Sequence, residues 1–132
     1  MIVLDTSALV EFLVGADQVA EDVRSAIIGE RLAAPHSVDL ECASALRGLT
    51  LAKKLPADEG RRALELLGNL NLRRFGHAAL LSRIWELRHN IWPYDAAYVA
   101  LAEALGVDLV TVDAKFEGVP GLKCVVRNVW KR

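Results

Sequence analysis

Three aspartates in this chain, Asp5, Asp95 and Asp113, stand where an apolar segment begins or ends. A set of carboxylates without Cys or His ligands suits hard cations such as Mg²⁺ or Mn²⁺. A cation held in this way can make a bound water nucleophilic and can stabilise charge on a phosphate. The acids therefore predict a metal-dependent hydrolytic site, provided that the fold brings them together.

Two of these acids follow predicted strands. Residues 2–4 and 109–112 are short apolar runs rich in β-branched residues, as expected for buried strands of a parallel sheet, and they end at Asp5 and Asp113. The carboxyl ends of such strands form the edge where open α/β sheets bind ligands. A competing interpretation is that Asp5 only caps the helix that follows it. Thr111 lies two residues before Asp113, so both side chains point to the same side of an extended chain.

Asp95 stands at the start of a predicted helix from Pro93 to about Gly106. Residues 96–102 are apolar on every side, which is typical of a helix buried all round. A carboxylate beside such a helix is expected to be enclosed and to need a partner or a cation. The alternative is simple compensation of the helix dipole.

A fourth acid comes from a helix predicted over residues 37–54, with Ser37 as its cap. Asp39 and Glu41 lie at opposite margins of its apolar stripe, and periodicity does not choose between them. Both also suit a solvated first turn. Clustered carboxylates repel one another, so the pKa of at least one acid is expected to be raised when no metal is bound.

The remaining pattern alternates short strands and helices and predicts an α/β fold with a short, mostly parallel, twisted sheet flanked by helices. Further helices are expected from Asp17 to Ile28, from Pro56, and over residues 77–89. Further strands are expected at residues 32–34, 72–75 (an edge strand) and 124–126. The 132 residues suit a single domain, 1–132.

Composition narrows the class of protein. Apolar residues make up 53% and charged residues 25%, as in a globular protein. Cys42 and Cys124 are isolated, and the three histidines have no ligand spacing, so a zinc site is not expected. We expect a cytoplasmic protein, because Asp5 interrupts any signal peptide and no apolar run reaches the roughly 20 residues that span a bilayer.

The net charge of −1 is compatible with a nucleic-acid-binding surface if several acids are gathered in one pocket. Four acids taken from the 17 acidic residues leave 13 against 16 basic ones, so the rest of the chain carries +3. A loose basic band could hold a nucleic-acid backbone around such an acidic pocket. Its candidates are Arg61, Arg62, Arg73 and Arg74.

Four ordered motifs together resemble the PIN domain, and most of all the toxin ribonucleases of VapC type from type II toxin–antitoxin pairs. They are MIVLDTSAL, the set Pro35, Glu41 and Leu46, YDAAYVALAEALG, and LVTVDAKF, and they extend from Ile2 to about Val126. The resemblance implies a PIN-like three-layer fold. It selects Glu41 over Asp39 and implies an acidic quartet of Asp5, Glu41, Asp95 and Asp113 that binds metal and catalyses cleavage, with Ser7 and Thr111 as supporting groups.

The resemblance also implies an activity and partners. The activity is Mg²⁺- or Mn²⁺-dependent endoribonuclease cleavage that leaves a 5′-phosphate and a 3′-hydroxyl. The partners are RNA, a cognate antitoxin and a second copy in a homodimer, with no membrane. The antitoxin could lie between the early helices and the basic band, insert an Arg among the carboxylates, and pack on Phe12, Leu13 and Leu46, unless these three residues belong to the core.

Other classes fit the sequence less well. A haloacid-dehalogenase-type phosphatase would need an Asp where Ser7 stands. A response-regulator receiver would need paired acids after the first strand and a phosphoacceptor Asp on a middle strand. The remaining alternative is a non-catalytic PIN-like module that binds RNA or protein, and a cleavage assay with Mg²⁺ and with EDTA discriminates it from a nuclease.

Overall fold

The computed structural model describes residues 1–130; the last two residues, Lys131 and Arg132, lie outside the described residues. Within residues 1–130, five parallel strands form one sheet in the order β3-β2-β1-β4-β5. The strands are β1 (Ile2–Leu4), β2 (Leu32–Pro35), β3 (Leu72–Phe75), β4 (Asp108–Thr111) and β5 (Val126–Asn128).

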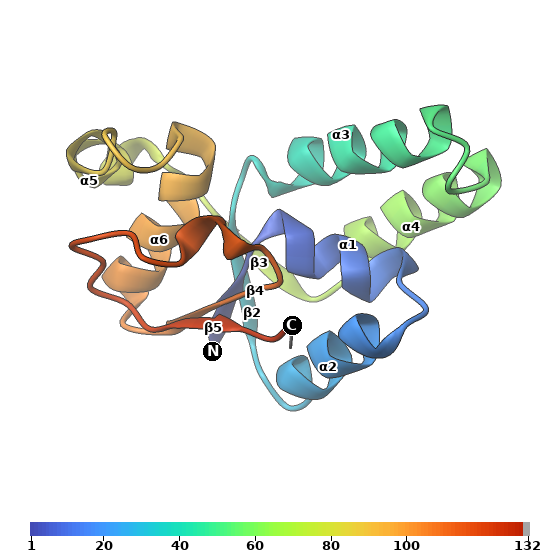
Figure 1. Ribbon diagram of the computed structural model, residues 1–132, viewed down its shortest axis with the longest axis horizontal. Helices are drawn as coiled ribbons and strands as arrows, with labels where there is room; N and C mark the ends of the chain where they lie inside the picture. The colour runs from blue at the N-terminus through green and yellow to red at the C-terminus, as the bar shows by residue number, and fades with distance from the viewer. Residues whose placement is uncertain (131–132) are drawn as a thin grey trace.

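Helices cover both faces of the sheet, which gives the three layers that the family resemblance implies (Figure 1). On one side lie α1 (Thr6–Val14) and α2 (Gln18–Ile27), extended by the pair α3 (Val38–Leu51) and α4 (Ala57–Asn69). On the other side lie α5 (Leu81–Glu86) and α6 (Pro93–Leu105). Two short 3₁₀ helices, η1 (Ala78–Leu80) and η2 (Ala114–Phe116), precede α5 and follow β4.

The central strand β1 explains why the N-terminal residues organise the molecule. Its three residues are buried, and it pairs with β2 on one side and β4 on the other, with Ile2 opposite both Leu32 and Asp108. The chain leaves β1 toward β2, whereas β4 returns on the opposite side. The gap between β1 and β4 is therefore the switch point at which open α/β sheets bind their ligands.

The predicted buried helix is confirmed. All residues of α6 from Ala96 to Ala102 are buried, and α6 packs against β1, β2 and β4. Pro93 begins the helix, and Gly106 ends it in the left-handed conformation, at a φ of 66° that favours glycine. This packing fixes the first turn of α6 close to the strand ends.

Two predicted elements are wrong in extent. The helix expected over residues 77–89 divides into η1 and the six-residue α5, which ends early so that Ile91 reaches the core at 6% exposure. The last strand is β5, not residues 124–126, because pairing places Val126 opposite Leu109 and Asn128 opposite Thr111. In both segments, packing outweighs the local apolar pattern.

Among residues 1–130, no helix is long and apolar enough to cross a membrane.

Candidate active site

Asp5 links the central strand to the first helix, and it is a cap and a buried candidate site residue. Its Oδ1 accepts hydrogen bonds from the Ala8 N–H (3.0 Å) and the Ser7 hydroxyl (2.7 Å), and its Oδ2 accepts one from Thr111 (2.6 Å). Only 1% of Asp5 is exposed. Burial raises the pKa of Asp5, although the hydrogen bonds from Thr111, Ala8 and Ser7 oppose that rise. The capping interpretation of Asp5 is therefore confirmed, and its burial at the sheet edge is compatible with the predicted role in a site.

The hydroxyls of Thr111 and Ser7 tie the end of β4 to the end of β1. Besides donating to Asp5, Thr111 Oγ1 accepts the Asp113 N–H (3.0 Å), and Ser7 Oγ accepts the Val112 N–H (3.3 Å). Thr111 is fully buried. These bonds hold Asp113 next to Asp5 and orient the Asp5 carboxylate.

The two acids of α3 have different surroundings. Glu41 Oε2 accepts from the hydroxyls of Ser37 (2.7 Å) and Tyr98 (3.1 Å), on the side of α6. Asp39 instead pairs with Arg74 of β3, which donates to both of its carboxylate oxygens at 2.7 Å. Ser37 was predicted to cap α3, but its side chain makes no capping hydrogen bond and contacts Glu41 instead.

Burial also raises the pKa of Glu41. The hydrogen bonds from Ser37 and Tyr98 lower it, and the charge of Asp95 adds to the rise. A raised pKa was predicted for at least one acid, and it occurs at Glu41 and Asp5. The leading cause at both residues is burial, whereas the prediction attributed it to repulsion.

Lys115, in η2, provides the positive charge that the clustered acids share. Its Nζ lies 2.8 Å from Asp95 Oδ1 and 3.8 Å from Asp113 Oδ2. Partial burial alone would lower the pKa of Lys115, but the hydrogen bond to Asp95 and the charges of Asp95, Asp5 and Asp113 raise it overall. The same ammonium group stabilises the charged form of Glu41. The positive charge of Lys115 thus acts on all four acids, through ion pairs with Asp95 and Asp113 and at longer range on Asp5 and Glu41.

Among the described residues, no group of three or more Asp, Glu, His or Cys side chains is arranged to hold a metal ion. Two of the acids at this edge of the sheet, Asp95 and Asp113, face the Lys115 ammonium rather than forming a ready-made metal cage. The donor set still fits a hard divalent cation, because it consists of carboxylate and hydroxyl oxygens and already accommodates a positive charge.

An open groove of about 560 Å³ runs along this edge of the sheet. Ser7, Glu41 and Lys115 line it together with residues of α1 and α3, so the groove gives a ligand access to the acids. A phosphodiester chain lying in the groove would meet Lys115 before it reached the buried Asp5.

The four arginines of the predicted basic band each have a different local partner. The Arg74 guanidinium is occupied by Asp39 and by the carbonyl oxygens of Leu67 and Leu72. On α4, Arg61 pairs with Glu65. The other two members are Arg62, which donates to the Asp58 carbonyl oxygen, and Arg73, which stacks on the Phe75 ring.

The chain matches a known protein family. The PIN domain model matches residues 2–122. The chain belongs to the PIN domain family. Ribonuclease VapC9 of Mycobacterium tuberculosis is 44% identical over 129 residues, which cover 98% of each chain. Ribonuclease VapC1 of the same species is 38% identical over 128 residues, or 96% of each chain.

Solved structures share the PIN fold. VapBC2 from Rickettsia felis, bound to a DNA fragment from its promoter, aligns with a TM-score of 0.69 at 19% identity over 97% of this chain and 98% of that one. VapC20 of Mycobacterium tuberculosis, a toxin that cleaves the sarcin–ricin loop, also aligns with a TM-score of 0.69, at 16% identity over 91% of this chain and 95% of that one. At these identities the likeness concerns the fold.

Sequence reasoning missed two residues around the acids. Lys115 was passed over, although a Lys two residues after Asp113 is within reach of the same strand end. Tyr98 carries the one side-chain hydroxyl in the apolar stretch of α6, and it contacts both Glu41 and Thr6 (2.9 Å). Burial is the leading cause that raises the pKa of Tyr98, so its hydroxyl stays protonated and donates to Glu41.

Proposed function

We propose that this chain is a metal-dependent endoribonuclease of VapC type, the toxin of a type II toxin–antitoxin pair. One observation carries the proposal: at the switch point of the sheet, Lys115 pairs with Asp95 and Asp113, shares a groove with Glu41, and carries a charge that acts on the buried Asp5. Capping would explain Asp5 or Asp113 singly, but capping does not require the four acids to be neighbours. Relatives 44% and 38% identical over nearly the whole chain are named ribonucleases, which supports the same reaction.

In this proposal Asp5, Glu41, Asp95 and Asp113 hold Mg²⁺ or Mn²⁺. When bound, the metal supplies a water activated as nucleophile and stabilises charge on the leaving oxygen. The residues around the acids fix their geometry. Ser7 and Thr111 are supporting groups that orient Asp5, and their hydroxyls offset part of the cost of burying its charge.

Lys115 has two roles in the proposed reaction. Without metal, its ammonium offsets part of the negative charge of Asp95 and Asp113, which repels the other acids and the RNA backbone. With metal and RNA present, the same group lines the groove and can pair with a phosphate oxygen. Arg61, Arg62 and Arg73 remain candidates for contacts to the RNA backbone, whereas the Arg74 guanidinium is already committed to Asp39.

A cognate antitoxin is the proposed protein partner. A solved structure with the same fold, from Klebsiella pneumoniae, is a toxin–antitoxin complex. A hollow between α1 and α4, lined by Leu13, Arg62 and Leu66, is a place where an amphipathic segment could lie. Leu46, expected as a possible seat for such a segment, belongs to the core at 2% exposure, and Phe12 and Leu13 pack against the core. The homodimer stays a prediction without an assigned face.

Cleavage of total RNA by the purified chain tests the proposal. We expect cleavage with Mg²⁺ or Mn²⁺, none with EDTA, products with a 5′-phosphate and a 3′-hydroxyl, and no cleavage by Asp95→Asn. Asp39→Asn is the matched control, because it removes a neighbouring acid that faces Arg74 instead. A folded chain that binds RNA but does not cut it with either metal would favour the non-catalytic module.

A further inference from the structure

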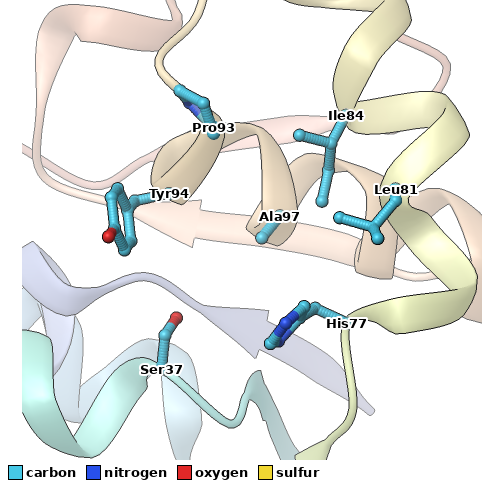
Figure 2. Close-up of a pocket in the computed structure, with 7 residues that line it drawn as sticks. All are labelled: Ser37, His77, Leu81, Ile84, Pro93, Tyr94 and Ala97. Carbon is cyan, nitrogen blue, oxygen red and sulfur yellow. The ribbon is translucent and has the colours of Figure 1, made fainter.

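A small hollow lies next to the acids and plays no part in the proposed cleavage step. His77 and Tyr94 lie on either side of Ala97 at this hollow, which we call the Tyr94–His77 slot (Figure 2). Leu81 and Ile84 form its apolar wall. Its volume is about 140 Å³, close to that of an apolar cavity of roughly 150 Å³ that holds one benzene ring.

The slot shares residues with the acidic cluster. Ser37 lines the slot and donates its hydroxyl hydrogen to Glu41 at 2.7 Å. Tyr94 directly precedes Asp95 in the first turn of α6. A polymer bound at the acids could therefore extend along Ser37 and the first turn of α6 into the slot.

The residues of the slot suit a planar ring with polar edges. Tyr94 is 66% exposed, so its ring is available for stacking. His77, Ser37 and the Tyr94 hydroxyl provide hydrogen-bonding groups around apolar walls. Aromatic side chains that stack on unpaired bases and polar groups that meet base edges are the usual means of recognising single-stranded RNA.

The charge around the slot also favours a nucleic acid. Among the described residues, no Asp or Glu lines the slot. Pro93 joins the slot to a second hollow, lined by Arg88, His89 and the 79% exposed Trp92, and no described acid lines that hollow either. A strip with aromatic rings and basic groups but no carboxylates thus leads away from the acids, as a binding surface for an RNA strand requires.

We propose that the Tyr94–His77 slot binds one unpaired nucleobase of the RNA next to the phosphate at the acidic cluster. This inference rests on the proposed function and adds a specificity site to it. An apolar side chain of a protein partner is the competing occupant. The single-ring volume and the polar groups around the walls favour a base.

The test measures binding without cleavage. The background is Asp5→Asn with Mg²⁺, and the probes are fluorescent single-stranded RNAs that span a mapped cleavage site, each with one abasic position. We expect Tyr94→Ala to weaken binding of the intact RNA about 10-fold, as stacking of one base allows. Tyr94→Phe, which keeps the ring, should retain most of the affinity. Trp85→Ala is the matched control, because Trp85 is an exposed aromatic (67%) that does not line the slot.

The decisive result is a thermodynamic cycle. For RNA that is abasic at one position beside the cleaved bond, Tyr94→Ala should no longer weaken binding, since the base that Tyr94 contacts is already missing. Equal effects of Tyr94→Ala and Trp85→Ala, or an equal effect of Tyr94→Ala on every abasic RNA, would overturn the proposal. So would loss of antitoxin binding with unchanged RNA affinity, which would assign the slot to a protein.

Failure of the slot and failure of the nuclease are separable. If the chain cleaves RNA but shows no position-dependent cycle, only the base site is wrong. If the unmodified chain cleaves no RNA, the same abasic series is made in a single-stranded RNA that the chain binds, and a position-dependent cycle there would assign the slot to a non-catalytic RNA-binding module.

Discussion

Asp5 illustrates how one carboxylate serves the fold and the site together. Its Oδ1 accepts the N–H that begins α1, while its Oδ2 accepts the hydroxyl hydrogen of Thr111 from β4. The capping interaction places Asp5 at the sheet edge, and burial there raises its pKa. The sequence posed a choice between capping and chemistry because a local pattern reveals the cap but not the strand that arrives more than 100 residues later.

Asp5→Asn should abolish cleavage, at least about 100-fold, because a charged ligand is lost from the proposed metal site. The fold should persist, since Asn keeps a side-chain oxygen for the Ala8 N–H. The raised folded-state pKa means that the native state binds more protons than the unfolded state between the ordinary carboxyl pKa and the raised value. Wild-type stability therefore falls as pH rises through that window, and the cost is complete above it.

In the Asp5→Asn variant, the fall of stability with rising pH should lack the contribution of Asp5 and keep that of Glu41, whose pKa is also raised. The unfolding temperature in EDTA, recorded from the ordinary carboxyl range up to neutral pH, measures this pH dependence. Identical slopes for wild type and variant would contradict the burial of Asp5 as a charged group.

Lys115→Met should lower the unfolding temperature in EDTA, because Asp95 and Asp113 lose their cation. The side chain is one third exposed, so the loss is about 1 kcal/mol. Addition of Mg²⁺ should then stabilise the variant more than the wild type, since the metal no longer competes with the ammonium. Lys54→Met, at an exposed position after α3, is the matched control. An equal Mg²⁺-induced shift in both variants would show that Lys115 does not occupy the metal region.

At the scale of the element, α3 separates two acids that the sequence could not tell apart. Asp39 and Glu41 are two residues apart, so they diverge around the helix, and each meets a different neighbour. Arg74 of β3 pairs with Asp39, whereas Tyr98 of α6 and Ser37 donate hydrogen bonds to Glu41. Periodicity correctly placed Asp39 and Glu41 at opposite margins of the apolar stripe of α3. The choice needed the resemblance to a family, because it depends on which element packs against which margin.

The two acids should therefore respond in opposite ways. Asp39→Asn should leave cleavage unchanged and lower the free energy of unfolding by about 1 kcal/mol, because it weakens a bidentate but partly exposed pair. Glu41→Gln should reduce cleavage at least about 100-fold while leaving stability near that of the wild type, since Gln still accepts from Ser37 and Tyr98. Activity and chemical denaturation measured on both variants give the comparison. A loss of cleavage in Asp39→Asn equal to that in Glu41→Gln would assign the wrong acid.

At the scale of the whole molecule, the sheet and its main helices could be predicted because each buried strand is an uninterrupted apolar run and α6 is apolar all round. The same reasoning placed Asp5, Asp95 and Asp113 near one edge. It failed at α5 and β5, where tertiary pairing decides the boundaries, and it overlooked Lys115, because the need for a cation becomes evident only when the acids are neighbours.

The placement of β1 between β2 and β4 has a consequence for how the molecule comes into being. The first strand to leave the ribosome acquires its partner β4 only after residues 108–111 have been made, and closing so long a loop is a late event in folding. The hydrogen bond from the Thr111 hydroxyl to Asp5 likewise forms only after β4 has been made. A nascent or truncated chain that ends before β4 therefore contains Asp5, Glu41 and Asp95 but no assembled cluster. Synthesis itself delays the chemistry, so a cell has nearly the full translation time of the chain in which to supply whatever restrains it.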